Sequence, residues 1–175
     1  MKQQGMKNRA RILFVTEAAL IAALYTVLTV FVGAFGLANG AIQFRVSEAL
    51  CVLPFFTPAA IPGLAVGCFL SNLFTGCIWQ DVLFGTLATL IGAYGAHWLR
   101  RASWLIPLPT VLANTLIVPP VLAYGYGFEG GLPYFMLTVG VGEVLSAYVC
   151  GMVLFFAVKP YGHKIFRSKI GFAKS

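Results

Sequence analysis

Several polar side chains lie inside an otherwise apolar chain, and their types suit recognition of a small planar ligand. Glu48 and Glu143 are carboxylates, and Asn72 and Asn114 are amides, all within or beside apolar runs. A carboxylate can accept two N–H groups from a guanine-like ring edge, and amides can match the remaining donors and acceptors. A charge deep in a membrane segment costs roughly 2.5–3.5 kcal/mol, so Glu143 should face a partner or a cavity.

Three segments between the apolar runs, residues 36–46, 76–81 and 125–131, add polar and aromatic groups. The full set of candidate substrate-binding residues is Gln43, Arg45, Glu48, Asn72, Trp79, Gln80, Asp81, Asn114, Tyr124 and Glu143. Trp79, Tyr124 or Tyr126 could stack on a ring, and Phe and Leu side chains would fill the rest of a mostly apolar pocket.

Structural roles stay open for some of these candidates. Asn114 could form an interhelical hydrogen bond, worth about 0.6 kcal/mol on average in membrane proteins. Glu143 could pair with another side chain for structural reasons alone. Arg45 could form a salt bridge or contact a lipid headgroup, or it could form the wall or lid of a pocket beside Glu48.

No pattern typical of catalysis accompanies these residues. The sequence contains no GxxxxGK[ST], HExxH or GxSxG motif. His97 and His163 are isolated, and the four cysteines lie in or beside apolar runs without the spacing of metal ligands. We therefore expect no enzyme, no metal site and no cofactor, and we expect any active transport to draw its energy from elsewhere.

The composition predicts an integral membrane protein. The chain has 175 residues, of which 59% are hydrophobic and 10% are charged, and its formal net charge is +7. Soluble domains carry about 25% charged residues, so this chain has too little polar surface for a water-soluble fold of its size. Basic residues beside membrane segments account for the positive charge, and nucleic-acid binding is not expected.

The apolar runs predict an all-α membrane protein with six transmembrane helices in a single integral membrane domain, residues 1–175. The expected spans are residues 12–35, 47–57, 61–75, 82–99, 104–124 and 132–158. The second and third are short for a span, and one proline-kinked helix in their place would leave five crossings. With six crossings every Lys and Arg except Arg45 lies on one side, so the positive-inside bias favours six spans with both termini cytoplasmic.

The first span is rich in small residues. Ala18 with Ala22, and Ala19 with Ala23, form two small-xxx-small pairs, which let another helix backbone approach closely. The residues alone leave packing within this chain and docking to a partner protein equally open. Glu17 lies near the cytoplasmic end of this span, where we expect local pairing or partner docking rather than substrate contact.

The run IQFRVSEALCVLPFFTPAAIPGLAVGCFLSNL resembles the QueT family of bacterial membrane proteins. The resemblance extends from the first span to the sixth, and the QFRxSEAL element followed by LPFFTPAAIPG is its most specific part. It implies a multi-pass protein of the bacterial cell membrane that acts as the substrate-binding S component of an energy-coupling factor (ECF) transporter. The implied substrate is queuosine or its deazaguanine precursor, a guanine-like ring that carries an aminomethyl group in the precursor.

The resemblance also implies partners. An S component docks on a T component that is driven by two ATPases of the ABC type, so ATP is used by the partner subunits. The docking contact would be an Ala-xxx-Ala surface on the first helix, where Ala18 with Ala22, or Ala19 with Ala23, occupies the matching region. Two alternatives are an S component for another vitamin or nucleobase, and a stand-alone proton-coupled carrier that uses Glu143 and Asp81 as proton carriers.

Overall fold

The structure is a computed structural model of the chain, and it describes residues 2–34, 45–127 and 130–166. All regular structure within these ranges is helical, which confirms the predicted all-α class. Four helices there are long and apolar enough to cross a membrane, namely Gln4–Ala34, Trp79–Arg101, Ser103–Gly125 and Leu132–Val158, and Val46–Phe55 and Ala60–Phe74 are shorter apolar helices. The six crossings and the cytoplasmic position of both termini stay predictions.

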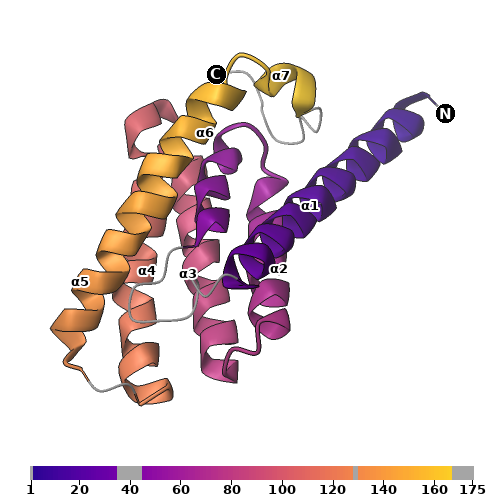
Figure 1. The fold of residues 1–175 in the computed structure, drawn as a ribbon. Helices are drawn as coiled ribbons and strands as arrows, with labels where there is room; N and C mark the ends of the chain where they lie inside the picture. The colour runs from indigo at the N-terminus through magenta and orange to yellow at the C-terminus, as the bar shows by residue number, and fades with distance from the viewer. Residues whose placement is uncertain (1, 35–44, 128–129, 167–175) are drawn as a thin grey trace.

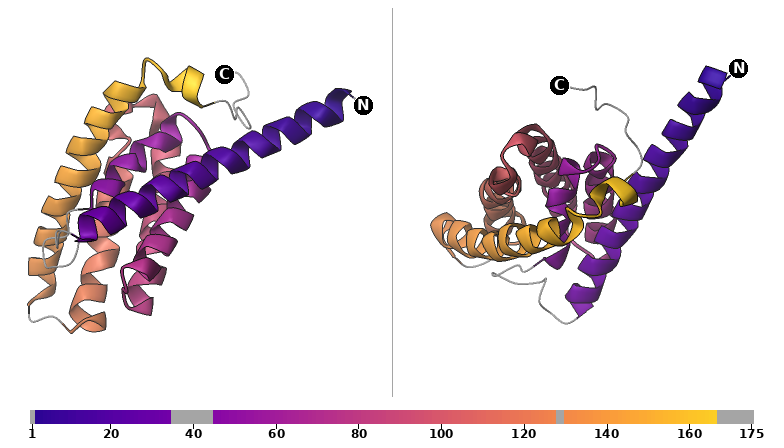
Figure 2. Two further views of the ribbon diagram at one scale, coloured as in Figure 1. Left: turned by 45° about the vertical axis from the view of Figure 1, so that its right-hand side comes forward. Right: turned by 90° about the horizontal axis from the view of Figure 1, so that it is seen from above.

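The helices form one bundle (Figure 1). In chain order they are α1 (Lys2–Ala34), the 3₁₀ helix η1 (Val46–Phe55), α2 (Ala60–Phe74), α3 (Trp79–Trp98), the short 3₁₀ turns η2 (Leu99–Arg101) and η3 (Ser103–Leu105), α4 (Leu108–Pro120), the π-helical η4 (Val121–Gly125), α5 (Leu132–Glu143), the π-helical η5 (Val144–Cys150), α6 (Gly151–Val158) and α7 (Gly162–Ile165). Helix α1 crosses the bundle obliquely, and its first turns project beyond the other helices (Figures 1 and 2). The start of α1 and helix α7 lie toward the same end of the bundle (Figure 1).

Helix η1 lies at the centre of this bundle. Residues 47–54 are all buried, and α1, α3, η5 and α6 surround them (Figure 1). A 3₁₀ helix rises about 2.0 Å per residue, so its length of 10 residues reaches about 20 Å, against about 15 Å in an α-helix. Side chains three residues apart eclipse one another in this geometry, which places Arg45, Glu48 and Cys51 along one ridge.

The turn between η1 and α2 is fixed by prolines and by Thr57. Pro62 lies in the first turn of α2, where the missing N–H has no helical partner to lose. The N–H of Ala59 donates to Oγ1 of Thr57 at 3.2 Å, and the Thr57 hydroxyl donates to Oε2 of Glu17 at 2.8 Å. Glu17 therefore connects α1 to the turn that follows η1. From the sequence alone, local pairing and docking to a partner protein were both open for this residue.

Small residues bring α1 and α2 into backbone contact. A Cβ on Gly63 would lie 2.8 Å from the carbonyl oxygen of Ala18, and a Cβ on Gly67 would lie 2.7 Å from Cβ of Tyr25 and 3.0 Å from the carbonyl oxygen of Ala22. Real Cβ atoms essentially never lie closer than 3.0 Å to such neighbours, so the contact requires glycine at both positions of α2.

The two alanine pairs of α1 therefore have different surroundings. Ala22 is buried and Ala18 is half-buried against α2, whereas Ala19 and Ala23 are exposed. The Ala18–Ala22 pair packs within this chain, and the Ala19–Ala23 pair lies at its surface.

Gly67→Ala should lower the thermal unfolding temperature of the purified protein in detergent. The added methyl group meets Cβ of Tyr25, and overpacking of a tight contact costs about 1–3 kcal/mol. Gly5→Ala is the control, because nothing lies within 4 Å of a Cβ at Gly5, and it should leave the unfolding temperature unchanged or slightly raised. A Gly67→Ala protein that unfolds at the wild-type temperature would contradict this packing.

Candidate substrate-binding site

Glu48 is the centre of a buried polar group between α1 and η1. Its side chain is 2% exposed, and the Tyr25 hydroxyl donates a hydrogen bond to its Oε1. One helical turn further along α1, the Thr29 hydroxyl donates to Oγ of Ser47 at 2.7 Å. Two neighbouring hydrogen bonds therefore fix the start of η1 against α1 and hold one carboxylate oxygen of Glu48.

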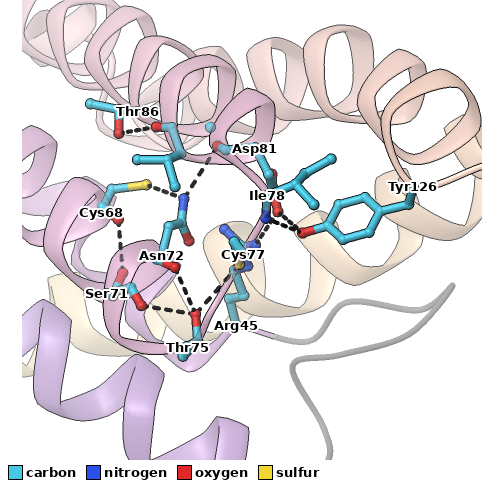
Figure 3. A network of polar contacts seen from close by, with 12 residues as sticks. Arg45, Cys68, Ser71, Asn72, Thr75, Cys77, Ile78, Asp81, Thr86 and Tyr126 are labelled. Carbon is cyan, nitrogen blue, oxygen red and sulfur yellow. Dashed lines mark hydrogen bonds and ion pairs between the residues drawn. The ribbon is translucent and has the colours of Figure 1, made fainter.

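Arg45 links this group to a second one at the turn between α2 and α3. Nη2 of Arg45 lies 3.7 Å from Oδ2 of Asp81, and the two side chains are 10% and 2% exposed. The Tyr126 hydroxyl donates to the same Asp81 oxygen at 3.1 Å and accepts from the N–H of Ile78 at 3.3 Å. Figure 3 shows Arg45, Asp81 and Tyr126 converging from three separate segments of the chain.

Tyr126 keeps its proton in this arrangement. Partial burial and the neighbouring Asp81 carboxylate raise the pKa of Tyr126 above its ordinary value, because both disfavour the phenolate. The hydroxyl is therefore the donor to Asp81, and it holds the segment after η4 against the start of α3.

Asn72, in the last turn of α2, lies beside Asp81 (Figure 3). Its Nδ2 donates to the backbone carbonyl oxygen of Asp81 at 3.4 Å and lies 3.7 Å from Sγ of Cys68. This contact orients the amide, because a reversed amide would bring two oxygens together. Oδ1 of Asn72 and Oδ1 of Asp81 are buried and have no hydrogen-bond partner among the described residues.

Asn114 of α4 and Glu143 of α5 are both buried. Helices α4 and α5 pack side by side (Figure 1). Glu143 is the last residue of α5, directly before the π-helical η5, and such wide turns are frequent at functional sites. The two side chains are 6% and 4% exposed and close enough to interact. Oε2 of Glu143 and Nδ2 of Asn114 nevertheless lack a partner in hydrogen-bond geometry within the part of the chain that the structure describes.

Electrostatic interactions connect these groups into one site. Arg45 interacts with Glu48 and Glu143 as well as with Asp81, and the two glutamates interact with each other. Six candidates from the sequence therefore gather in one buried region: Arg45, Glu48, Asn72, Asp81, Asn114 and Glu143.

The structure places three other candidates elsewhere. Trp79 is 65% exposed and Tyr124 is 82% exposed, while Gln80 is half-buried. Gln80 and Tyr124 line a hollow of about 490 Å³ on the outside of α3 and α4, together with Phe84, Leu87 and other apolar side chains. Gln43 lies outside the described residues.

Tyr25, Thr29 and Ser47 belong to the site but were not among the candidates from the sequence. Tyr25 and Thr29 lie four residues apart in an apolar helix, so they share one helix face, and Ser47 directly precedes Glu48. That spacing of two hydroxyl side chains was the available signal.

The sequence model of a family described as QueT transporter matches residues 15–160. The protein named Queuosine precursor transporter QueT, from Lactococcus lactis subsp. cremoris (strain MG1363), is 42% identical over 77 residues, which cover 44% of this chain and 45% of that protein. The match therefore spans about half the length of this relative. No solved structure matches the chain.

Arg45→Met should lower the free energy of unfolding by on the order of 3 kcal/mol, because Asp81 then stays buried without its cation. Asp81→Asn should destabilise the protein for the converse reason. The double variant should be less destabilised than the sum of the two single variants, since neither charge is left buried alone. Denaturant unfolding in detergent measures this coupling, and strictly additive effects would argue against a direct ion pair.

Proposed function

The chain belongs to the QueT transporter family, and from that premise we propose that it is the substrate-binding S component of an ECF-type importer for queuosine or its deazaguanine precursor. It is a multi-pass protein of the bacterial cell membrane. The single observation that most supports a binding role is that four buried polar atoms, on Asn72, Asp81, Asn114 and Glu143, have no hydrogen-bond partner among the described residues. Each such atom costs about 1–3 kcal/mol, and a ligand that pairs with it recovers that free energy.

Glu143 and Asn114 offer complementary chemistry to a guanine-like ring. Oε2 of Glu143 is an acceptor and Nδ2 of Asn114 is a donor, and both are buried without a hydrogen-bond partner among the described residues. The edge of such a ring carries N–H groups together with a carbonyl oxygen or ring nitrogen, so one side chain accepts while the other donates. Glu48, oriented by Tyr25, supplies a second carboxylate within the same interior.

In this proposal the chain captures the substrate and leaves ATP hydrolysis to its partners, a T component and two ABC ATPases. The exposed Ala19–Ala23 pair supports a docking role for α1, because small residues let a partner helix approach closely in a membrane. The Ala18–Ala22 pair is already occupied by Gly63 and Gly67 of α2.

Calorimetric titration of the purified chain in detergent with the aminomethyl deazaguanine precursor should show one-to-one binding without ATP. Glu143→Gln should keep the fold and weaken binding about 10- to 100-fold, because an amide nitrogen replaces one acceptor oxygen and a buried ligand N–H left unpaired costs about 1–3 kcal/mol. Glu17→Gln is the matched control, since Glu17 pairs with Thr57 at the opposite end of η1 from Arg45. Its affinity should equal that of the wild type.

Two outcomes of that titration would count against the proposal. No binding by a wild-type protein shown to be folded would remove the proposed function. Unchanged affinity in Glu143→Gln would remove Glu143 from the site while leaving the proposed function in place.

The double variant Ala19→Leu/Ala23→Leu should bind the precursor as the wild type does but fail to co-purify with the T component and its ATPases. Bulky side chains at both positions prevent close approach of a partner helix. Ala157→Leu, at an exposed alanine of α6, is the control and should still co-purify. Full assembly of the double variant would exclude this face of α1 as the docking surface.

A further inference from the structure

The unpaired buried atoms of the site form two groups with different chemistry. Beside Asn114 and Glu143 the group is mixed, with one donor nitrogen and one acceptor oxygen. At the turn between α2 and α3 both unpaired atoms are acceptors, Oδ1 of Asn72 and Oδ1 of Asp81. The side chains of Asn72 and Asp81 are each 1% exposed, so both oxygens are withdrawn from solvent.

This difference determines what each group can bind. A mixed pair suits a ring edge, which carries donors and acceptors together. A pair of acceptors needs a ligand group that only donates, and an ammonium group supplies three N–H donors and no acceptor. The contact of Asn72 Nδ2 with the Asp81 carbonyl oxygen, at 3.4 Å, keeps Oδ1 of Asn72 available as the acceptor.

The charges of the site also favour a cation. Glu48, Asp81 and Glu143 supply three carboxyl groups, and Arg45 is the basic side chain that interacts with them in the described part of the chain. Neither residues 35–44 nor residues 128–129 contain Lys or Arg in their sequence. Acidic groups therefore outnumber basic ones among the described residues of the site, and a ligand ammonium group meets acceptor oxygens there.

Gly85 lies close beside the Asn72 amide and the Asp81 carboxylate. It lies one helical turn after Asp81, and a Cβ at this position would lie 3.1 Å from Nδ2 of Asn72 and 3.6 Å from Oδ1 of Asp81. Any larger residue would therefore intrude beside the two side chains.

We propose that Asn72 and Asp81 form a subsite for the ammonium group of the ligand, and that this subsite makes the protein select cationic ligands over neutral ones with the same ring. The inference rests on the proposed function and specifies which part of the site reads the charge. The mixed group at Asn114 and Glu143 then reads the ring edge, and Arg45 lies between the two groups as the resident cation.

The test compares two ligands with one ring, the aminomethyl deazaguanine precursor and the same ring with a methyl group in place of the aminomethyl group. Calorimetric titration of the wild type should give a dissociation constant at least about 30-fold lower for the cationic ligand, as expected for a charged hydrogen bond. Equal affinities would overturn the inference and leave the proposed function standing. No binding of either ligand would instead remove the proposed function.

Variants then locate the subsite through the ratio of the two affinities. Asn72→Ala removes one acceptor and keeps the Arg45–Asp81 ion pair, so it should reduce the ratio about 5-fold or more. Asp81→Asn should bring the ratio close to one, and Asn72→Ala remains decisive if loss of the ion pair prevents that variant from folding. Asn114→Ala is the matched control and should weaken both ligands equally, with the ratio kept.

If Asn72→Ala keeps the wild-type ratio of the two affinities, the assignment of the subsite is overturned. Loss of the ratio in Asn114→Ala alone would place the ammonium group at the mixed pair instead.

Discussion

The buried guanidinium of Arg45 is the constraint on which the rest of the arrangement depends. A charge at the start of the central helix is tolerated only if other groups compensate it. Asp81 comes from α3 to do so, Tyr126 supports Asp81 from the end of η4, and Glu48 lies one 3₁₀ turn further along η1. These contacts fix one end of η1, and the Thr57–Glu17 hydrogen bond ties its other end to α1.

The site gains its rigidity from helices that approach closely rather than from loops. Gly63 and Gly67 allow contact between α1 and α2, and on the other side of the bundle a Cβ on Gly92 would meet Thr110 at 2.5 Å. Polar atoms held on such a scaffold cannot move to satisfy one another. Three oxygens and one nitrogen of the candidate site therefore stay without a partner among the described residues of the folded chain. Under the proposed function, stability is given up there for binding.

Composition and charge were enough to predict the helical membrane class. Glu48 and Glu143 are buried in the structure, and their role as substrate-binding residues stays a prediction. The conformation of the central helix and the direction in which individual side chains point could not be predicted in the same way. The sequence of a ten-residue apolar segment does not show whether it forms a 3₁₀ helix or an α-helix. The aromatic side chains of Trp79 and Tyr124 are equally suited to a ligand pocket and to a membrane interface. Tyr25 was missed because a tyrosine in an apolar helix has the composition of ordinary core. The two alanine pairs of α1 are offset by one residue, which turns them about 100° apart around the helix. Only the packing of α2 against α1 shows which pair is buried and which is exposed.

Tyr25 shows how the site and the surface of α1 are connected. Its hydroxyl donates to Glu48, and its Cβ lies against Gly67 in the closest contact between α1 and α2. The exposed Ala19–Ala23 pair lies on the same helix, six and two residues before Tyr25, and on a different face. An α-helix is stiff over such a distance, so a change in the position of Glu48 on ligand binding would act on α1 as a whole. Under the proposed function, the helix that touches the site is therefore also the helix that meets the partner, and substrate occupancy reaches the docking surface through one element without a separate relay.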